Sequence, residues 1–207
     1  MMEKYPKIDS IFKRDEKGEF TDEYSRPEFE YLKDNTWIFT EKVDGTNIRI
    51  IWDCEDRSLA ICGRTNESQI PPFLLRKLDE MFQASKFIKF YPKTSMTLYG
   101  EGYGRRIQKG GAKYIPDGVS FVLFDVKIDR WWLELEDVHD IAEKLEIDCV
   151  PVVGKGTLQE AIGMTKDGIR SRWGDFIMEG LVIKPAVQIF NRMGNRIITK
   201  VKHKDFK

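Results

Sequence analysis

The sequence predicts an α+β fold in which antiparallel β-sheets are flanked by helices. Short runs rich in β-branched and aromatic residues recur along the chain and outnumber the segments with helical periodicity. Glycine and proline are scattered between these runs and mark no linker. The chain has 207 residues, 41% of them hydrophobic, which suffices for one sizeable core. We therefore expect one globular domain over residues 1–207.

Seven segments are expected to be strands, because each is a short apolar or alternating run bounded by polar or turn residues. In chain order they are Trp37–Glu41, Ile48–Asp53, Leu59–Gly63, Met96–Glu101, Ser120–Ile128, Glu179–Lys184 and Arg196–Val201. Asp44 and Gly45 separate the first two segments, and this pair is typical of a hairpin turn. A plain turn is therefore the simplest interpretation of this site.

Three segments are expected to be helical. Pro72 can open a helix that runs to about Ala84, with apolar residues at core-facing spacing. A second apolar stripe of helical period covers Leu135–Leu145. Thr157 and Glu160 have the spacing of a capping box and predict the start of a short third helix.

Composition excludes several classes of protein. The 34 basic and 34 acidic residues balance, which excludes a strongly polycationic nucleic-acid binder, although Arg105–Lys113 and Lys200–Lys207 are locally basic. The three cysteines lack metal-ligand spacing and are expected to be buried free thiols. No apolar run approaches the ~20 residues of a membrane helix, and the first residues do not resemble a secretory signal. A cytoplasmic protein without a membrane partner is expected.

Ionisable groups lie at the ends of several expected strands. Lys42 ends the first strand directly before a polar segment, where a nucleophilic amine could be presented. Glu101 lies between two glycines, and Glu179 begins a later strand. Lys200 and Lys202 are two residues apart, so both ammonium groups project from one face of a strand. Singly these are ordinary surface residues, but together they indicate a site.

The order of Lys42, Glu101, Phe124, Glu179 and the Lys200/Lys202 pair resembles the motif series of the covalent nucleotidyltransferase superfamily. This superfamily comprises the ATP-dependent DNA and RNA ligases and the mRNA-capping guanylyltransferases. Its nucleophile motif, Lys-x-Asp-Gly, matches residues 42–45. The resemblance implies a nucleotidyltransferase catalytic domain, an ATP-grasp-like ligase fold.

Several segments resemble the RNA ligase 2 branch more closely than DNA ligases. Asn47 stands where DNA ligases and capping enzymes usually have arginine. Further matching segments are Gly63-Arg64-Thr65, Ile107-Gln108-Lys109, Phe124-Asp125 and Gly194-Asn195-Arg196. That branch often has histidine where this chain has Asp44, so a minimal DNA ligase stays an alternative. A guanylyltransferase and a nucleotide-binding protein without catalysis are further alternatives.

The resemblance implies a role for each residue. Lys42 would attack the α-phosphorus of ATP and carry AMP, with Lys200 and Lys202 favouring its neutral form and neutralising phosphates. Glu179 would work with Mg²⁺ or Mn²⁺. The implied nucleotide-binding set comprises Glu101 for the ribose, Phe124 for stacking on the purine, Glu41 for the adenine edge, Asn47 and Arg64 for AMP and the nucleic-acid end, Lys184 for phosphate, and the adjoining Asp44 and Gly45.

The implied substrate is an RNA end or a nicked duplex with an RNA 3′-hydroxyl. The sequence given ends five residues after Lys202, where related enzymes continue into an OB-fold or a helical domain. We expect no such appended domain here. The cluster Arg105–Lys113, or a partner protein, is then expected to supply RNA contacts.

Overall fold

The computed structural model describes residues 4–206, which form two compact units. Among the described residues, unit 1 comprises Asp44–Val150 together with residues 4–5. Unit 2 comprises Pro6–Val43 and the chain from Pro151 onward. Each unit has its own cluster of buried apolar side chains. The expectation of one core is therefore wrong, because each sheet buries its apolar face within its own unit.

Unit 2 is built on a five-stranded sheet in the order β1-β13-β12-β4-β11. The strands pair antiparallel, except that β1 and β13 are parallel. Their bounds are Asp9–Ser10 (β1), Trp37–Glu41 (β4), Val152–Gly156 (β11), Gly180–Pro185 (β12) and Thr199–Lys202 (β13). The remaining elements are β2 (Phe12–Arg14), β3 (Phe20–Tyr24), α1 (Pro27–Tyr31), α5 (Leu158–Asp167) and η2 (His203–Phe206).

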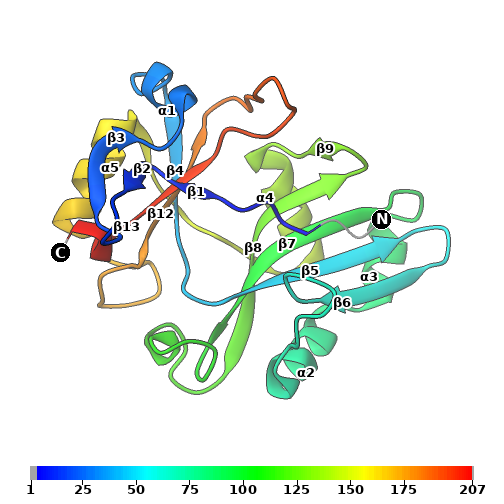
Figure 1. Cartoon of the computed structure of the whole chain (residues 1–207). Helices are drawn as coiled ribbons and strands as arrows, with labels where there is room; N and C mark the ends of the chain where they lie inside the picture. Colours follow the sequence, from blue (N-terminus) through cyan, green and yellow to red (C-terminus); the bar gives the residue numbers. More distant parts are fainter. Residues whose placement is uncertain (1–3, 207) are drawn as a thin grey trace. The chain divides into compact units, whose positions relative to one another are not determined.

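Helix α5 covers the core-facing side of this sheet, where it contacts β11, β12 and β13 (Figure 1). The predicted capping box is confirmed: the Thr157 hydroxyl accepts from the Glu160 backbone N–H, and the Glu160 carboxylate accepts from that of Thr157. Leu181, Ile183 and Val201 point into the core under α5. The alternate residues of β12 and β13 therefore lie on the opposite face of the sheet.

Unit 1 is built on a six-stranded sheet with the main order β10-β8-β7-β5-β6, and β9 pairs with β8. Figure 1 shows β5, β6 and β7 side by side, in agreement with their registers. The strands are β5 (Thr46–Asp53), β6 (Ser58–Cys62), β7 (Met96–Gly104), β8 (Val119–Ile128), β9 (Trp131–Trp132) and β10 (Asp148–Cys149). The helices are α2 (Pro72–Met81), α3 (Ala84–Phe90), η1 (Gly111–Lys113) and α4 (Leu135–Leu145).

All seven predicted strands are present within a few residues of their expected bounds, and the α+β fold is confirmed. The predicted helix from Pro72 instead ends at Met81, and α3 begins separately at Ala84. The cause is Phe82, whose backbone is extended and whose ring packs edge-on against Phe121 at 5.0 Å. A helical Phe82 would lose this core contact.

The hairpin interpretation of Asp44 and Gly45 is wrong. Strand β4 pairs with β11 and β12, whereas β5 pairs with β6 and β7. The chain passes from unit 2 to unit 1 between Val43 and Asp44. Gly45 also lacks the positive φ that a tight hairpin turn of this type requires.

Two further expectations concern cysteines and membranes. Cys54, Cys62 and Cys149 are free thiols, as expected, but each is only partly buried and not buried as expected. Within residues 4–206, no helix combines the length and the apolar composition needed to cross a membrane.

Candidate active site

Three charged side chains of unit 2 form one ion cluster. The Lys42 Nζ lies 2.6 Å from Glu179 Oε2, and the Lys202 Nζ lies 2.6 Å from Glu179 Oε1. The side chains of Lys42, Glu179 and Lys202 are 21%, 16% and 24% exposed. Both oxygens of one carboxylate are thus held between two ammonium groups that remain reachable from solvent. We call these three residues the lysine–glutamate cluster.

Gly180 explains how the sequence builds this cluster. A Cβ atom at Gly180 would lie 2.0 Å from the Val201 carbonyl oxygen and 2.7 Å from the Lys202 Cα, so only glycine lets β12 approach β13 here. Gly180 is the register partner of Lys202, and its carbonyl accepts a 2.9 Å hydrogen bond from the Lys42 backbone N–H. Glu179, the residue before Gly180, therefore lies close to Lys42 at the end of β4 and to Lys202 at the end of β13.

The electrostatics of the cluster favour an ionised carboxylate. Burial alone would raise the pKa of Glu179, but Lys42 and Lys202 outweigh burial and hold that pKa below its ordinary value. Burial lowers the pKa of Lys200, and the positive charges of Lys42 and Lys202 lower it further. Four charged groups thus share one field, in which each further positive charge disfavours the protonated form of a lysine.

The other predicted lysines lie on the same face of the sheet as this cluster. Thr199 and Val201 are buried, and the alternating Lys200 and Lys202 are partly exposed on the opposite face, as the period of two predicts. Lys200 is the register partner of Val182, and Lys184 follows Val182 two residues later on β12. The strand period therefore puts Lys184 on this face as well.

A pocket of about 520 Å³ in unit 2 includes Lys200 in its lining. The other charged lining residues are Lys7, Asp9, Lys13, Arg14 and Arg26. Arg26 is paired with Asp9, and Arg14 lies 2.9 Å from Asp205. Lys13 also lies 2.6 Å from Glu23. With these three pairs counted, Lys7 and Lys200 still make the lining more basic than acidic, which suits an anionic ligand.

Glu41 is buried, at 1% exposure, and holds a turn in unit 2. Its Oε1 accepts a 2.5 Å hydrogen bond from the Ser171 hydroxyl, and its Oε2 accepts one of 2.9 Å from the Arg172 backbone N–H. Burial raises the pKa of Glu41 although both bonds favour the charged form. Sequence reasoning did not single out Ser171, because nothing local relates it to a residue 130 positions away.

In unit 1, the structure brings Asn47 and Glu101 together. They are register partners on β5 and β7, so their side chains share one face of the sheet. A Cβ at Gly45 would lie 2.3 Å from the Gly102 carbonyl oxygen and 2.7 Å from the Glu101 Cγ. The backbone at position 45 therefore lies too close to Glu101 and Gly102 for a side chain, which explains why this residue is glycine. Within residues 4–206, the buried Oδ1 of Asn47 has no hydrogen-bond donor.

The segment around Asp44 is fixed by two residues of the loop after β7. The Asp44 backbone N–H donates to the Tyr114 hydroxyl at 3.2 Å, and the Gln108 Nε2 donates to the Gly45 carbonyl at 3.0 Å. Gln108 belongs to the Ile107-Gln108-Lys109 segment singled out in the sequence. That segment therefore contacts the residues that follow the expected nucleophile.

Phe124 lies in a β-bulge. The register of β7 and β8 shifts so that Tyr99 faces Asp125 and Gly100 faces Leu123, which leaves Phe124 as the additional residue. It is partly exposed between buried neighbours, and its ring meets Tyr5 edge-on at 5.0 Å. A bulge turns the side chain away from the regular alternation, which is a common way to present an aromatic ring to a ligand.

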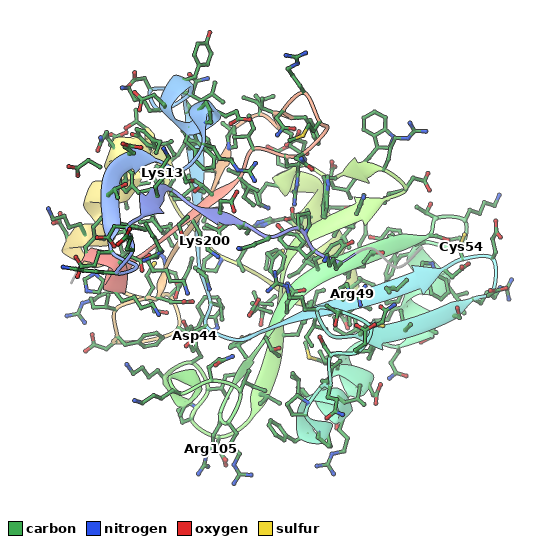
Figure 2. The ribbon with its side chains drawn as sticks, viewed as in Figure 1. Lys13, Asp44, Arg49, Cys54, Arg105 and Lys200 are labelled. Carbon is green, nitrogen blue, oxygen red and sulfur yellow. The ribbon has the colours of Figure 1, made fainter. Side chains whose placement is uncertain are left out.

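Arg64 is exposed in the loop after β6. A second arginine, Arg49 on β5, is buried and forms hydrogen bonds with this loop (Arg49 is labelled in Figure 2). Arg49 is 0% exposed; its Nε donates to the Gly63 carbonyl at 2.8 Å and its Nη2 to Asn66 Oδ1 at 2.9 Å. Sequence reasoning missed Arg49. The sequence signal that could have identified Arg49 is an arginine among the apolar residues of a strand, where a buried guanidinium must donate hydrogen bonds to nearby groups.

The residues that could hold a metal ion are few. Within residues 4–206, no group of three or more His, Cys, Asp or Glu side chains is arranged for this purpose. A Mg²⁺-like ion is commonly held by one or two carboxylates together with water and substrate phosphates. Glu179 fits that requirement in charge and exposure.

Comparisons with known proteins identify a family. A family model described as RNA ligase matches residues 35–202. A comparison with curated proteins gives no match.

Solved structures resemble the chain in fold. A variant of Naegleria gruberi RNA ligase with ATP and Mn is 17% identical at a TM-score of 0.70, over 99% of this chain and 59% of that one. The same enzyme with PPi is 21% identical at 0.66, over 98% and 62%. An archaeal ATP-dependent RNA ligase is 19% identical at 0.66, over 98% and 49%. The chain thus spans about half to three-fifths of the length of these proteins.

Proposed function

Because the chain belongs to the RNA ligase family, we propose that it is an ATP-dependent RNA ligase with Lys42 as its nucleophile. The Lys42 amine attacks the α-phosphorus of ATP, forms a P–N bond and expels pyrophosphate. The AMP then passes to the 5′-phosphate of an RNA end. A 3′-hydroxyl finally attacks that phosphate, a phosphodiester bond forms and AMP leaves.

The lysine–glutamate cluster is the observation that carries this proposal. An ammonium group cannot attack phosphorus, so Lys42 must first give up a proton. The Glu179 Oε2, at 2.6 Å from the Lys42 Nζ, is within hydrogen-bond reach to take or relay it. Lys202 on the other oxygen fixes the carboxylate in place.

The same lysines would meet the charge of the triphosphate. Lys200, Lys202 and Lys184 share one face of the sheet, and Lys200 borders the basic pocket of unit 2. Fixed positive charges of this kind stabilise the charge that develops on a leaving pyrophosphate. When bound, Mg²⁺ or Mn²⁺ would neutralise that leaving group further, and Glu179 is the residue proposed to hold it.

The nucleoside roles that the resemblance implies are part of the proposal. The acceptor of Asn47 and the carboxylate of Glu101, adjacent on β5 and β7, suit ribose and phosphate-end contacts. The bulged Phe124 suits stacking on a purine. Each Glu41 oxygen has a second lone pair, so its bonds to Ser171 and Arg172 leave capacity for an exocyclic amine. Asp44, Gly45, Arg64 and Lys184 complete the proposed nucleotide-binding set.

The first test is covalent labelling with radiolabelled ATP, GTP and NAD, read by denaturing electrophoresis. We expect labelling by ATP with Mg²⁺ or Mn²⁺, one added AMP by mass spectrometry, and no label in Lys42→Ala. Lys155→Ala, which removes an exposed lysine from β11 of the same unit, is the matched control and should label normally. Undiminished label in Lys42→Ala would contradict the proposal.

The second test separates the alternatives by substrate. A nicked duplex with an RNA 3′-hydroxyl strand should be sealed, and faster when its 5′-end already carries AMP. Efficient sealing of an all-DNA nick would favour the minimal DNA ligase, and GTP labelling equal to that by ATP would favour a guanylyltransferase.

Three further predictions come from the sequence. They are a cytoplasmic location, a single adenylation domain over residues 1–207 and a partner protein that shares RNA contacts.

A further inference from the structure

None of the residues that line a groove in unit 1 belongs to the lysine–glutamate cluster or to the proposed nucleotide-binding set, although Arg105 and Arg106 belong to the Arg105–Lys113 cluster. The groove has a volume of about 670 Å³ and is formed by α2 and the segment that connects β7 to β8. Its charged lining residues are Arg76, Lys77, Glu80, Arg105, Arg106 and Asp117. In Figure 2 the Arg105 side chain projects away from the ribbon at this end of unit 1. The groove is therefore open to a large ligand.

Two of the four basic residues keep their charge uncompensated. Lys77 lies 3.8 Å from Glu80, and Arg105 lies 3.1 Å from Asp117, whose side chain is 94% exposed. Within residues 4–206, Arg76 and Arg106 take part in no ion pair, and both are exposed. The two acids each face one base, so the groove retains the charge of two arginines. Such a surface attracts an anion with more than one charge.

The backbone of Arg106 gives a second, independent observation. Its φ is +69°, in the left-handed region that disfavours a residue with a side chain and that glycine or asparagine usually occupies. Hydrogen bonds on both sides fix this turn: Arg105 N–H to Gly118 O at 2.8 Å and Ile107 N–H to Gly104 O at 3.2 Å. The chain thus keeps an arginine where the backbone favours glycine. A ligand for the guanidinium would explain why.

Arg76 comes from a different part of the chain. On α2, Leu74 and Leu78 are buried in the core of unit 1, and Arg76 lies on the exposed side of the same helix. Two guanidinium groups from a helix and a fixed turn therefore line one groove. Guanidinium groups bind phosphate oxygens in a bidentate manner, which makes a chain of phosphodiesters the best-fitting ligand.

We propose that this groove binds the phosphodiester backbone of the RNA substrate, with Arg76 and Arg106 as the phosphate contacts. The proposal rests on the proposed RNA ligase function and adds a binding surface outside the lysine–glutamate cluster. It narrows the expected RNA contacts of Arg105–Lys113 to the residues that line the groove and adds Arg76 from α2.

The test compares Arg106→Gly and Arg76→Gln with Arg57→Gly. Arg57 is the matched control, because it is also an exposed arginine of unit 1 with positive φ (51°) but does not line the groove. Glycine relieves backbone strain at both positions, so neither glycine variant should lose stability. Binding to a short fluorescent nicked RNA duplex is measured by anisotropy over a series of salt concentrations.

We expect Arg106→Gly and Arg76→Gln each to weaken RNA binding about threefold to tenfold at low salt and to reduce the slope of log K against log[salt] by about 1. Arg57→Gly should leave both values unchanged. Lys42 adenylylation without RNA should be normal in all three variants. RNA affinity and slope equal to the parent protein in both groove variants would overturn the groove proposal. A protein that loses RNA affinity in those variants but never takes up AMP would support the groove and contradict the ligase function.

Discussion

The polar residues of the two units differ in how their charges and hydrogen bonds are satisfied. In unit 2, Lys42, Glu179 and Lys202 satisfy one another through two contacts of 2.6 Å. In unit 1, Asn47 keeps a buried carbonyl oxygen without a donor among the described residues. A self-satisfied cluster contributes to stability before any ligand binds, whereas an unsatisfied buried acceptor costs free energy until a ligand supplies a donor. Mutations at the two places should therefore affect stability differently.

The largest expected effect is that of Glu179→Gln. It removes the negative charge from between two ammonium groups, so we expect Lys42 adenylylation to slow by ~10²-fold or more. Loss of two charge-assisted hydrogen bonds should also lower the free energy of unfolding by about 1–3 kcal/mol. Single-turnover labelling and urea unfolding measure the two effects.

The pH dependence of stability provides a control for Glu179. Because its pKa is lower in the folded protein than the ordinary 4.5, its contribution is complete above that value and is lost as pH falls through the folded pKa. The acid limb of the stability curve should therefore flatten in Glu179→Gln. An unchanged acid limb would mean that the carboxylate is not held by the lysines in solution.

Unlike Glu179→Gln, Asn47→Ala should reduce activity without reducing stability. Its Oδ1 makes no hydrogen bond within residues 4–206, so the free energy of unfolding should change by about 0.5 kcal/mol or less, or increase. Sealing of RNA should nevertheless fall about tenfold or more, because a ligand contact is lost. A marked loss of stability with full activity would show that the Asn47 side chain is structural.

Arg49→Lys tests whether Arg49 acts through Arg64. Lysine keeps the charge but cannot span both Gly63 O and Asn66 Oδ1, so we expect RNA sealing to slow by roughly tenfold. In an Arg64→Ala background the same change should have no further effect on the rate, since the loop no longer carries the arginine. An equal effect in both backgrounds would indicate a role in stability alone.

The smallest expected effect concerns Lys200. Its pKa is lower in the folded protein than the ordinary 10.5, so the protonated lysine destabilises the fold at neutral pH, and this is relieved as pH rises from the folded pKa towards 10.5. Lys200→Met should therefore gain up to about 1 kcal/mol at pH 7, with the gain vanishing near pH 10.5, while adenylylation falls. Lys155→Met should show no gain. A destabilised Lys200→Met would contradict this account.

The sequence predicted the elements whose pattern is strong. The central strands and the capped helix α5 follow from alternation and from the Thr157–Glu160 pair. Strand β11 was not predicted, because Gly154 and Gly156 lower its strand propensity and its pairing with β4 decides its structure. The edge strands β1, β9 and β10 have two residues each, too few for a period to be read.

The sequence predicted the charged residues of the candidate site, because their side-chain chemistry and their positions at strand ends can be read directly from it. Lys42, Glu179 and Lys202 meet in one cluster, as their placement at strand ends suggested. The partners that hold the site could not be predicted in this way. Ser171 under Glu41 and Arg49 under the Arg64 loop are set by long-range packing, and neither carries a local motif.

The path of the chain through the two units has a consequence for folding. The segment Asp44–Val150 of unit 1 is inserted into the chain of unit 2, and the two strands that flank this insertion, β4 and β11, pair with each other. During synthesis the last strand of unit 1 is complete once Cys149 is made, whereas β4 can pair with β12 only after residues 180–185 are made. Lys42 and Glu179, 137 residues apart, therefore meet only in the final stage of folding. A chain interrupted before Glu179 would carry the nucleophile without the carboxylate that orients it.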